Sequence, residues 1–274
     1  MSLVHNLRLI VAQLQKPDTN EGNLFYNKYK FKKFLSDHNI RTPKTYHFIT
    51  DPDKVPNKFP DEFVLKPNNA SSGTDVYVLK RINDHEYQEI DGRIHQDVFV
   101  QGKIKNILSI QRANGVIVEE LIRNPEELKV LLGESKGIID LRFYVLFNNI
   151  LYGKLRIPNS KSKGYANTGR KATAMFVDEN GIIGKRNIFR NTTTNHPDIK
   201  RSFNKMKVPL WDEFSRTALN VTKLFNLKFH SVDVTIDDQG KGCVCESECI
   251  PYLGYYTDPG CLDLMNRIIK YRDS

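Results

Sequence analysis

Residues 229–251, FHSVDVTIDDQGKGCVCESECIP, constrain the fold more than any other stretch because they have the pattern of a β-hairpin. The alternation over residues 231–236 predicts one strand, and residues 243–248 predict a second. The polar turn between them contains Gly240 and Gly242, which favour a reversal of the chain. We therefore expect antiparallel sheet in the C-terminal part of the protein.

Acidic side chains gather on one face of this hairpin. Because side chains alternate along a strand, Asp233 lies on one face of the first strand and Glu246 and Glu248 share a face of the second. The cysteines of the second strand are expected on its other face: Cys243, Cys245 and Cys249. Neighbouring carboxylates repel one another unless a cation lies between them, and hard oxygen ligands without histidine favour Mg²⁺. The alternative interpretation is a solvated acidic face.

The length and hydropathy of the chain set its class. Its 274 residues can form one large domain or two closely packed lobes. Its mean hydropathy is −0.48, and no apolar run approaches the roughly 18 residues of a membrane span. The N-terminal sequence lacks the features of a secretory signal, so we expect the cytoplasm.

The four cysteines all follow residue 242 and cannot form a disulfide framework for the whole chain. Their C-x-C-x₃-C spacing raises the possibility of zinc, but no second ligand pair follows at zinc-finger spacing. Buried apolar side chains are the favoured interpretation.

Positive charge is concentrated in one part of the chain. The net charge is +9, and residues 154–206 contain twelve Lys and Arg against three acidic residues. Such a window favours an anionic partner, although a solvated basic face is the alternative. Aromatic residues are not interleaved with these charges, so nucleic acid is not expected.

The N-terminal half shows a strand–loop–strand unit. A helix is predicted over residues 23–39, followed by a strand at 45–49. Strands at 63–66 and 76–79 flank a loop rich in small residues, whose backbone N–H groups can bind an anion. Lys66, at the end of the first of these strands, can reach a phosphate. The loop has no Walker A sequence, so an ordinary hairpin turn is an equal alternative.

The rest of the chain alternates further strands with two helices. The strand that ends in Glu119 and Glu120 precedes another that carries Asp140 and Arg142 on one face. The predicted strands span 115–122, 138–147, 151–157, 172–177 and 181–184, and the helices span 209–226 and 261–271.

From about residue 23 onward, the order of these segments resembles the ATP-grasp superfamily. Lys28, Lys66 and the loop 68–73 are similar to its phosphate-binding elements, and residues 119–121 to its adenine hinge. The pattern Asp140-x-Arg142, Arg156, Asn167-x-Gly169 resembles that of the α-L-glutamate ligases. Asp233 and Glu246-x-Glu248 match the metal-binding D…E-x-N, with Glu248 in place of the family's Asn. Sugar-transfer-associated and teichuronopeptide-biosynthesis proteins are similar in their short N-terminal part.

This resemblance implies roles for individual residues. The residues implied to bind ATP are Lys28, Lys66, Ser71, Ser72, Gly73, Glu119, Glu120, Leu121, Glu126 and Asp140. Those implied to hold Mg²⁺ are Asp233, Glu246 and Glu248. Catalytic roles fall on Arg142, Arg156 and Asn167, with Arg156 holding the acyl group. Glu248 adds a negative charge to the metal site.

The resemblance also implies an α+β fold in which two lobes with antiparallel sheets clasp a nucleotide. Residues 1–22 form an N-terminal extension, residues 23–114 an N-lobe and residues 115–274 a C-lobe. The substrate-binding domain that precedes this point in many relatives is reduced or missing.

The implied activity is an ATP-dependent ligase that activates a carboxylate as an acylphosphate and couples it to an amine. The basic window favours an anionic polymer or a peptide as the acceptor. A kinase that phosphorylates a hydroxyl group, and a nucleotide-binding protein without catalysis, are the alternatives.

Overall fold

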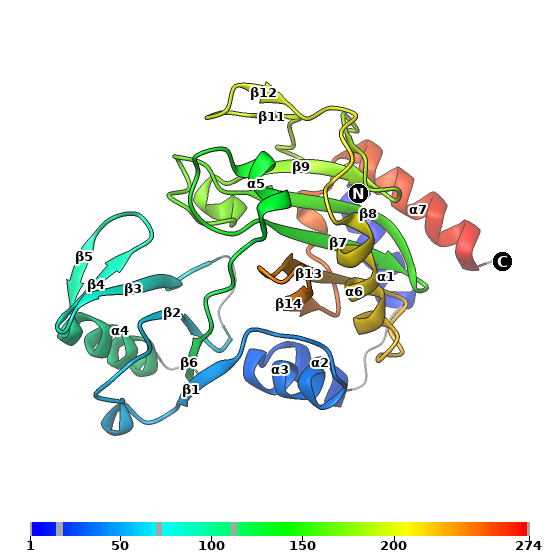
Figure 1. The fold of residues 1–274 in the computed structure, drawn as a ribbon. Helices are drawn as coiled ribbons and strands as arrows, with labels where there is room; N and C mark the ends of the chain where they lie inside the picture. The colour runs from blue at the N-terminus through cyan, green and yellow to red at the C-terminus, as the bar shows by residue number, and fades with distance from the viewer. Residues whose placement is uncertain (1, 15–18, 70–72, 111–113, 273–274) are drawn as a thin grey trace.

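Two six-stranded antiparallel sheets form the framework of the protein (Figure 1). The computed structural model describes residues 2–14, 19–69, 73–110 and 114–272. Its helices are α1 (Leu3–Leu14), α2 (Thr19–Phe25), α3 (Lys28–Asp37), α4 (Asp97–Ser109), α5 (Glu126–Leu132), α6 (Trp211–Thr222) and α7 (Asp258–Arg272). None of the helices in these ranges combines the length and apolar character needed to cross a membrane.

The first sheet has the strand order β1-β6-β2-β3-β4-β5. Its strands are β1 (Thr45–Ile49), β2 (Glu62–Pro67), β3 (Tyr77–Asn83), β4 (Glu86–Glu89), β5 (Ile94–Gln96) and β6 (Val116–Glu119). Helix α4 covers one face through Val100, Ile104 and Ile107, which pack with Phe63 and Leu65 of β2. The predicted lobe boundary at residue 114 falls before β6, whose backbone pairs with β1 and β2 of this sheet.

The second sheet has the order β10-β9-β8-β7-β13-β14. Its strands are β7 (Asp140–Leu146), β8 (Asn149–Ile157), β9 (Thr173–Asp178), β10 (Ile183–Gly184), β13 (Phe229–Ile236) and β14 (Gly242–Glu248). The short strands β11 (Asn195–His196) and β12 (Arg201–Ser202) form a separate ribbon. Alternating residues on β7, such as Leu141 and Phe143, face the core beneath α6, so Asp140 and Arg142 face the opposite way.

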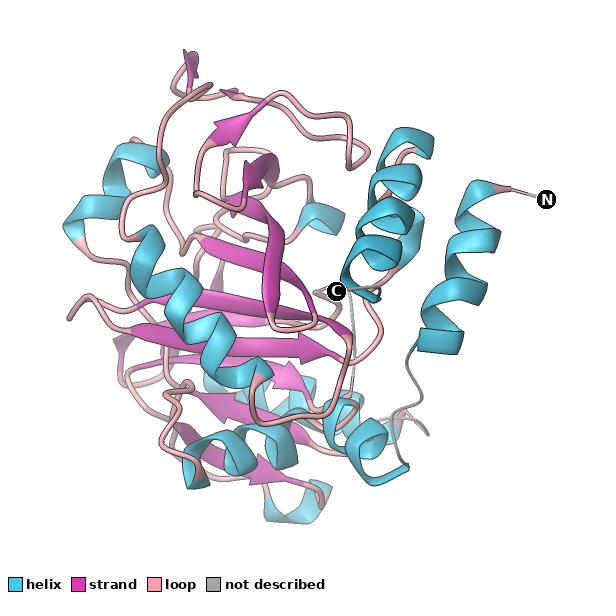
Figure 2. Ribbon diagram, turned by 90° about the vertical axis from the view of Figure 1, so that its right-hand side faces the viewer, coloured by secondary structure: helices cyan, strands magenta, loops and turns pink. Residues whose placement is uncertain are grey.

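Helices from both ends of the chain cover part of that opposite face. Figure 2 shows the N-terminal and C-terminal helices side by side. Leu7 and Val11 of α1 pack with Leu264 and Ile268 of α7 against Tyr152 of β8. The first residues of the chain are therefore part of the packing of the second sheet.

The predicted helix over residues 23–39 is wrong as a single element. The chain forms α2 and α3, which are separated at Asn27. Asn27 has an extended backbone, and its side chain accepts a hydrogen bond of 3.0 Å from the N–H of Lys30. Asparagine is favoured at a helix N-cap for this reason, and the cap restarts the helix in a new direction. Helices α1, α4 and α5 were not predicted.

A buried ion cluster joins α3 to the first sheet. Glu119 at the end of β6 pairs with Lys32 of α3, and its Oε1 lies 2.7 Å from Nζ of Lys66 on β2. Burial disfavours the charged form of each group, but the two lysines outweigh it at Glu119 and hold the pKa of that carboxyl below its ordinary value. The charge of Glu119 likewise raises the pKa of Lys66 despite burial.

We expect Leu7→Ala to lower the free energy of unfolding by about 2–4 kcal/mol, because a fully buried leucine leaves a cavity between α1 and the second sheet. Leu9→Ala on the same helix is the control, since Leu9 is 49% exposed. Denaturant titration of both variants measures the difference. Equal stability of the two would show that α1 does not pack as described.

We expect Glu119→Gln to cost about 3–5 kcal/mol at pH 7, because two buried lysines lose their counter-charge. Since the folded pKa of Glu119 is depressed, its contribution is complete above the ordinary value of 4.5 and is lost as the pH falls through the folded pKa. The difference between wild type and variant should therefore shrink on acidification.

Unfolding curves between pH 3 and pH 7 test this prediction. The matched control is Glu126→Gln, which removes an exposed partner of Lys129 and should change stability by no more than about 1 kcal/mol. A pH-independent effect of Glu119→Gln would contradict the ion-cluster explanation.

Candidate functional site

A pocket of about 690 Å³ lies between the two sheets. The first sheet contributes Val64, Lys66 and Val78, and the segment after β6 contributes residues 120–122. The inward faces of β7, β8, β13 and β14 form the other wall. The site residues predicted from the sequence that line this pocket are Lys28, Lys66, Gly73, Glu119, Glu120, Leu121, Asp140, Arg142, Arg156, Asn167, Asp233, Glu246 and Glu248.

Ser71 and Ser72, which were also predicted, lie outside the described residues. Glu126 does not line the pocket, because it begins helix α5, its side chain is 79% exposed and it pairs with Lys129. The helix dipole favours an acidic residue in the first turn, and this effect is enough to explain why a glutamate stands at position 126.

Lys28 and Lys66 approach the pocket from different elements. Nζ of Lys28, in the first turn of α3, lies 3.0 Å from Oε1 of Glu246 on β14. The start of α3 is fastened to the loop after β2, because Asn68 accepts hydrogen bonds from the N–H groups of Lys28 and Tyr29. This fastening brings the two lysines to the same end of the pocket.

The two glutamates of the predicted hinge, Glu119 and Glu120, both bind other groups of the protein. Glu119 is engaged by the two buried lysines, and Glu120 accepts hydrogen bonds from Arg41 at 3.0 Å and from the N–H of Lys44 at 3.0 Å. Arg41 in turn pairs with Asp237 at 2.6 Å, next to the turn of the C-terminal hairpin. Both carboxylates therefore have protein partners, and the hinge is held in position from both sheets.

Arg142 is surrounded by two of the acidic residues. Its guanidinium binds both oxygens of Asp233, at 2.6 and 2.8 Å, and Oε1 of Glu248 at 2.8 Å. The strand register explains this contact, because Asp233 lies directly opposite Arg142 across β13 and β7. Burial alone would raise the pKa of Asp233, but Arg142 and Arg156 outweigh it and hold that pKa well below its usual range.

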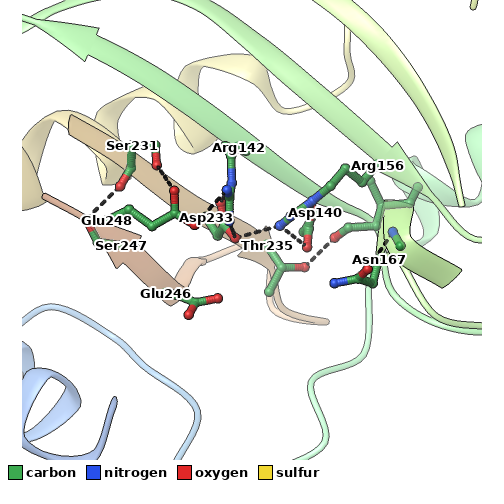
Figure 3. Close-up of polar contacts among 12 residues, drawn as sticks. Asp140, Arg142, Arg156, Asn167, Ser231, Asp233, Thr235, Glu246, Ser247 and Glu248 are labelled. Carbon is green, nitrogen blue, oxygen red and sulfur yellow. Dashed lines mark hydrogen bonds and ion pairs between the residues drawn. The ribbon is translucent and has the colours of Figure 1, made fainter. Parts of the chain in front are cut away.

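Arg156 completes the network (Figure 3). It pairs with both oxygens of Asp140, its register partner on β7, and donates to Asp233 at 2.6 Å. Burial, together with the nearby charge of Asp233, raises the pKa of Asp140 to about 6 despite Arg156. The sequence suggested that Arg156 holds an acyl group, whereas here its guanidinium is engaged by two carboxylates.

A β-bulge changes the predicted alternation on β14. Asp233 pairs with Glu246 and Val234 with Val244, which leaves Cys245 as an extra residue. Cys245 and Glu246 consequently both line the pocket, and the prediction that Cys245 faces away from the acidic residues is wrong. None of the four cysteines forms a disulfide in the part of the chain that the structure describes, and Cys243, Cys249 and Cys261 are buried.

The carboxylates fit a metal that is shared with a ligand. Among the described residues, no three Asp, Glu, His or Cys side chains lie close enough together to hold an ion by themselves. Each acidic group instead has a cationic partner: Lys28 at Glu246, and Arg142 at Asp233 and Glu248. Mg²⁺ commonly uses one or two carboxylates together with phosphate oxygens, so Asp233, Glu246 and Glu248 suit that arrangement.

The loop between β8 and β9 reaches across the pocket. Tyr165 donates a hydrogen bond of 2.8 Å to Glu89 of the first sheet, and Arg170 stacks on Tyr165 and donates to the backbone oxygen of Gly73 at 2.9 Å. Asn167 caps the short helical turn Thr168–Arg170 by accepting from the N–H of Gly169 at 2.7 Å. This loop connects the two walls beside Gly73.

Several pocket residues were missed by the sequence analysis. Lys154 could have been found, because the period-two pattern of β8 puts it on the same face as Arg156. Tyr165 lies on a loop and Tyr255 in a single 3₁₀ turn, and neither is long enough in regular structure for periodicity to indicate a direction. Lys32, which does not line the pocket but pairs with Glu119, carries no motif, and only the packing of α3 on β6 reveals its role.

Comparison with solved structures finds proteins of similar fold. The D-alanine–D-alanine ligase of Bacillus anthracis in complex with ATP is similar over 89% of this chain and 61% of that chain, with 12% identity and a TM-score of 0.51. The L-amino acid ligase of Bacillus licheniformis is similar over 83% of this chain and 41% of that chain, with 12% identity and a TM-score of 0.48. The D-alanine–D-alanine ligase of Helicobacter pylori is similar over 86% of this chain and 57% of that chain, with 16% identity and a TM-score of 0.47. The chain spans about two fifths to three fifths of these proteins.

A search of curated protein sequences finds no match. The family model described as sugar-transfer associated ATP-grasp matches residues 14–255, which include both sheets and the whole pocket wall. The α+β architecture with antiparallel sheets, predicted from the sequence, is confirmed. The chain belongs to the sugar-transfer associated ATP-grasp family.

Proposed function

We propose that the protein is an ATP-dependent ligase that activates a carboxylate as an acylphosphate and couples it to an amine. One observation carries this proposal: the pocket between the sheets brings Lys28, Lys66 and Arg142 within reach of the acidic groups of β13 and β14. A triphosphate and a carboxylate substrate repel each other in water, and such an array of cations offsets that repulsion.

The half of the pocket next to the first sheet suits a nucleotide. Val64 and Val78 supply an apolar wall on the first sheet, and the backbone of residues 120–122 supplies hydrogen-bonding groups for a base. Lys28 and Lys66 lie toward the acidic strands and suit the phosphates. The ion cluster around Glu119 keeps the ammonium group of Lys66 charged for this purpose.

Asp233, Glu246 and Glu248 are the proposed ligands of Mg²⁺. When bound, the ion would neutralise charge on the phosphate oxygens. Arg142 and Arg156 hold Asp233 in place, because Arg142 binds both of its carboxylate oxygens and Arg156 also donates to Oδ2. Glu248 adds a negative charge where the family pattern has Asn, which favours a divalent cation over a bare phosphate.

In the proposed reaction, the protein positions the reacting groups and keeps water away from the acylphosphate. The carboxylate of the acid attacks the terminal phosphoryl group of ATP and ADP leaves; an amine then displaces phosphate from the acylphosphate. Positioning by cations supplies most of the help in phosphoryl transfer. The loop that carries Tyr165 and Arg170 covers one side of the pocket, which excludes water from an intermediate that water would hydrolyse.

The acceptor is proposed to be anionic, as a polymer or a peptide segment, because of the basic window at residues 154–206. Measuring acceptor-dependent ADP release at increasing salt concentration tests this, since screening should weaken the attraction. Indifference to salt would count against an anionic acceptor.

Product analysis tests the activity itself. ADP and phosphate together with an amide product support the ligase; ADP with a phosphorylated acceptor would identify a kinase instead. A screen of amino acids and acidic peptides for ADP release is the practical starting point. Absence of turnover with preserved ATP binding would leave a binding protein and overturn the proposal.

We expect Lys66→Met to weaken the binding of Mg·ATP about 10- to 100-fold, the usual effect of losing a charge-assisted hydrogen bond. Glu119 retains Lys32 as its partner, so the fold should survive. Lys80→Met, which alters an exposed lysine of β3 in the same sheet, is the control. Calorimetric titration distinguishes the two, and equal affinities would exclude Lys66 from the nucleotide site.

We expect Mn²⁺, used as a spin probe for Mg²⁺, to bind at least about tenfold more tightly when ATP is present. The reason is that Lys28 and Arg142 occupy the carboxylates in the ligand-free protein. Water-proton relaxation distinguishes the ternary complex from free Mn·ATP. Asp233→Asn should abolish the ternary signal, whereas Asp238→Asn in the exposed hairpin turn should not. Tight Mn²⁺ binding without nucleotide would contradict this prediction.

A further inference from the structure

Lys154 lines the wall of the pocket that the second sheet forms. It belongs to β8 and lies directly opposite Arg142 of β7 in the strand register. Its residue is only 4% exposed, and its side chain lines the pocket. Within the described part of the chain, the ion pairs of this wall involve Arg142 and Arg156, and none is found for Lys154.

The two cations beside Lys154 are already neutralised. Arg142 binds Asp233 and Glu248, and Arg156 binds Asp140 and Asp233. These arginines therefore have little capacity for a further anion. Among the described residues of this wall, Lys154 is the cation that lacks a counter-charge.

Aromatic rings surround the ammonium group of Lys154. Its Nζ lies 4.4 Å from the ring centroid of Tyr255 and 5.7 Å from that of Phe189. Cation–π contacts of this kind stabilise a buried cation but do not cancel its charge. Burial, followed by the charges of Arg156 and Arg142, lowers the pKa of Lys154 to about 8, so the group is held at a cost that a bound anion would relieve.

We propose that Lys154 binds an anionic group of the substrate, in a subsite that Tyr144 and Tyr255 line beside it. This inference rests on the proposed function, and it names a substrate that carries an acidic group besides the one that reacts. The anion is a carboxylate or a phosphate, which share the negative oxygen that an ammonium group recognises.

The contacts of Lys154 separate this subsite from the reacting centre. Its ammonium group lies against the rings of Tyr255 and Phe189 and forms no ion pair with Asp233, which Arg142 and Arg156 engage. An anion held at Lys154 is therefore distinct from the carboxylate that meets the phosphoryl group near Asp233. A substrate with two acidic groups can occupy both positions.

The test uses the full chain with Mg²⁺ and a non-hydrolysable ATP analogue, so that the nucleotide half of the pocket is occupied. Succinate and inorganic phosphate are the two probes, and each is titrated calorimetrically into wild type and Lys154→Met. Lys228→Met is the matched control, because Lys228 also lies over an aromatic ring, that of Phe147, but outside the pocket. Lys154→Arg is a second variant that keeps the charge.

We expect at least one probe to bind wild type, and Lys154→Met to weaken that binding about 10- to 100-fold. Lys228→Met should leave it unchanged, and Lys154→Arg should retain it within about threefold if only charge is needed. Binding of succinate alone indicates a carboxylate substrate, and binding of phosphate alone indicates a phosphorylated one. No binding of either probe, or equal binding to Lys154→Met, overturns the proposal.

Nucleotide binding separates this inference from the proposed function. Lys154→Met should bind the ATP analogue as wild type does, and its melting temperature should be equal or higher because an unpaired buried charge is removed. If wild type fails to bind the analogue, the proposed function fails. If the analogue binds but the probes do not, only the Lys154 subsite fails.

Discussion

Burial of charges in matched pairs is the constraint on which the rest of the structure depends. The inward faces of both sheets carry ionised side chains that would not tolerate burial alone. Glu119 lies between two lysines, and Asp233 lies between two arginines. Each match joins elements distant in sequence, so the same contacts that build the pocket also hold the sheets around it.

This pairing explains why the pocket suits a ligand that carries both signs of charge. In the proposed complex, a metal and a triphosphate together would offer new partners to Lys28, Glu246 and Glu248, which are partly exposed in the ligand-free protein. Exchange of one ionic partner for another costs little compared with creating a charge in a dry site. The more deeply buried pairs, such as Arg142 with Asp233, can remain as a fixed frame.

Lys154 departs from this rule and is informative for that reason. The other inward cations each have a carboxylate partner, whereas the ammonium group of Lys154 lies among aromatic rings. An anion from outside the protein would supply the missing partner. The cluster of Lys and Arg over residues 154–206 begins at this lysine, although most of that cluster lies on the surface. The positive charge of the protein therefore predicted an anionic partner, and the burial of Lys154 identifies one position at which that anion could bind.

The sequence by itself determined the antiparallel hairpin of β13 and β14, most of the strands and the residue types of the pocket, because period-two alternation and turn residues are local signals. It could not determine the break at Asn27, since asparagine is favoured at a helix N-cap but does not by itself exclude a continuous helix. The bulge at Cys245 likewise depends on pairing with a partner strand. Only the tertiary structure decided which charges are paired. It engaged Arg156 with two carboxylates and left Lys154 without an ion pair among the described residues. The reason is that these ion pairs form between strands, and the register of two strands is not encoded in either segment alone.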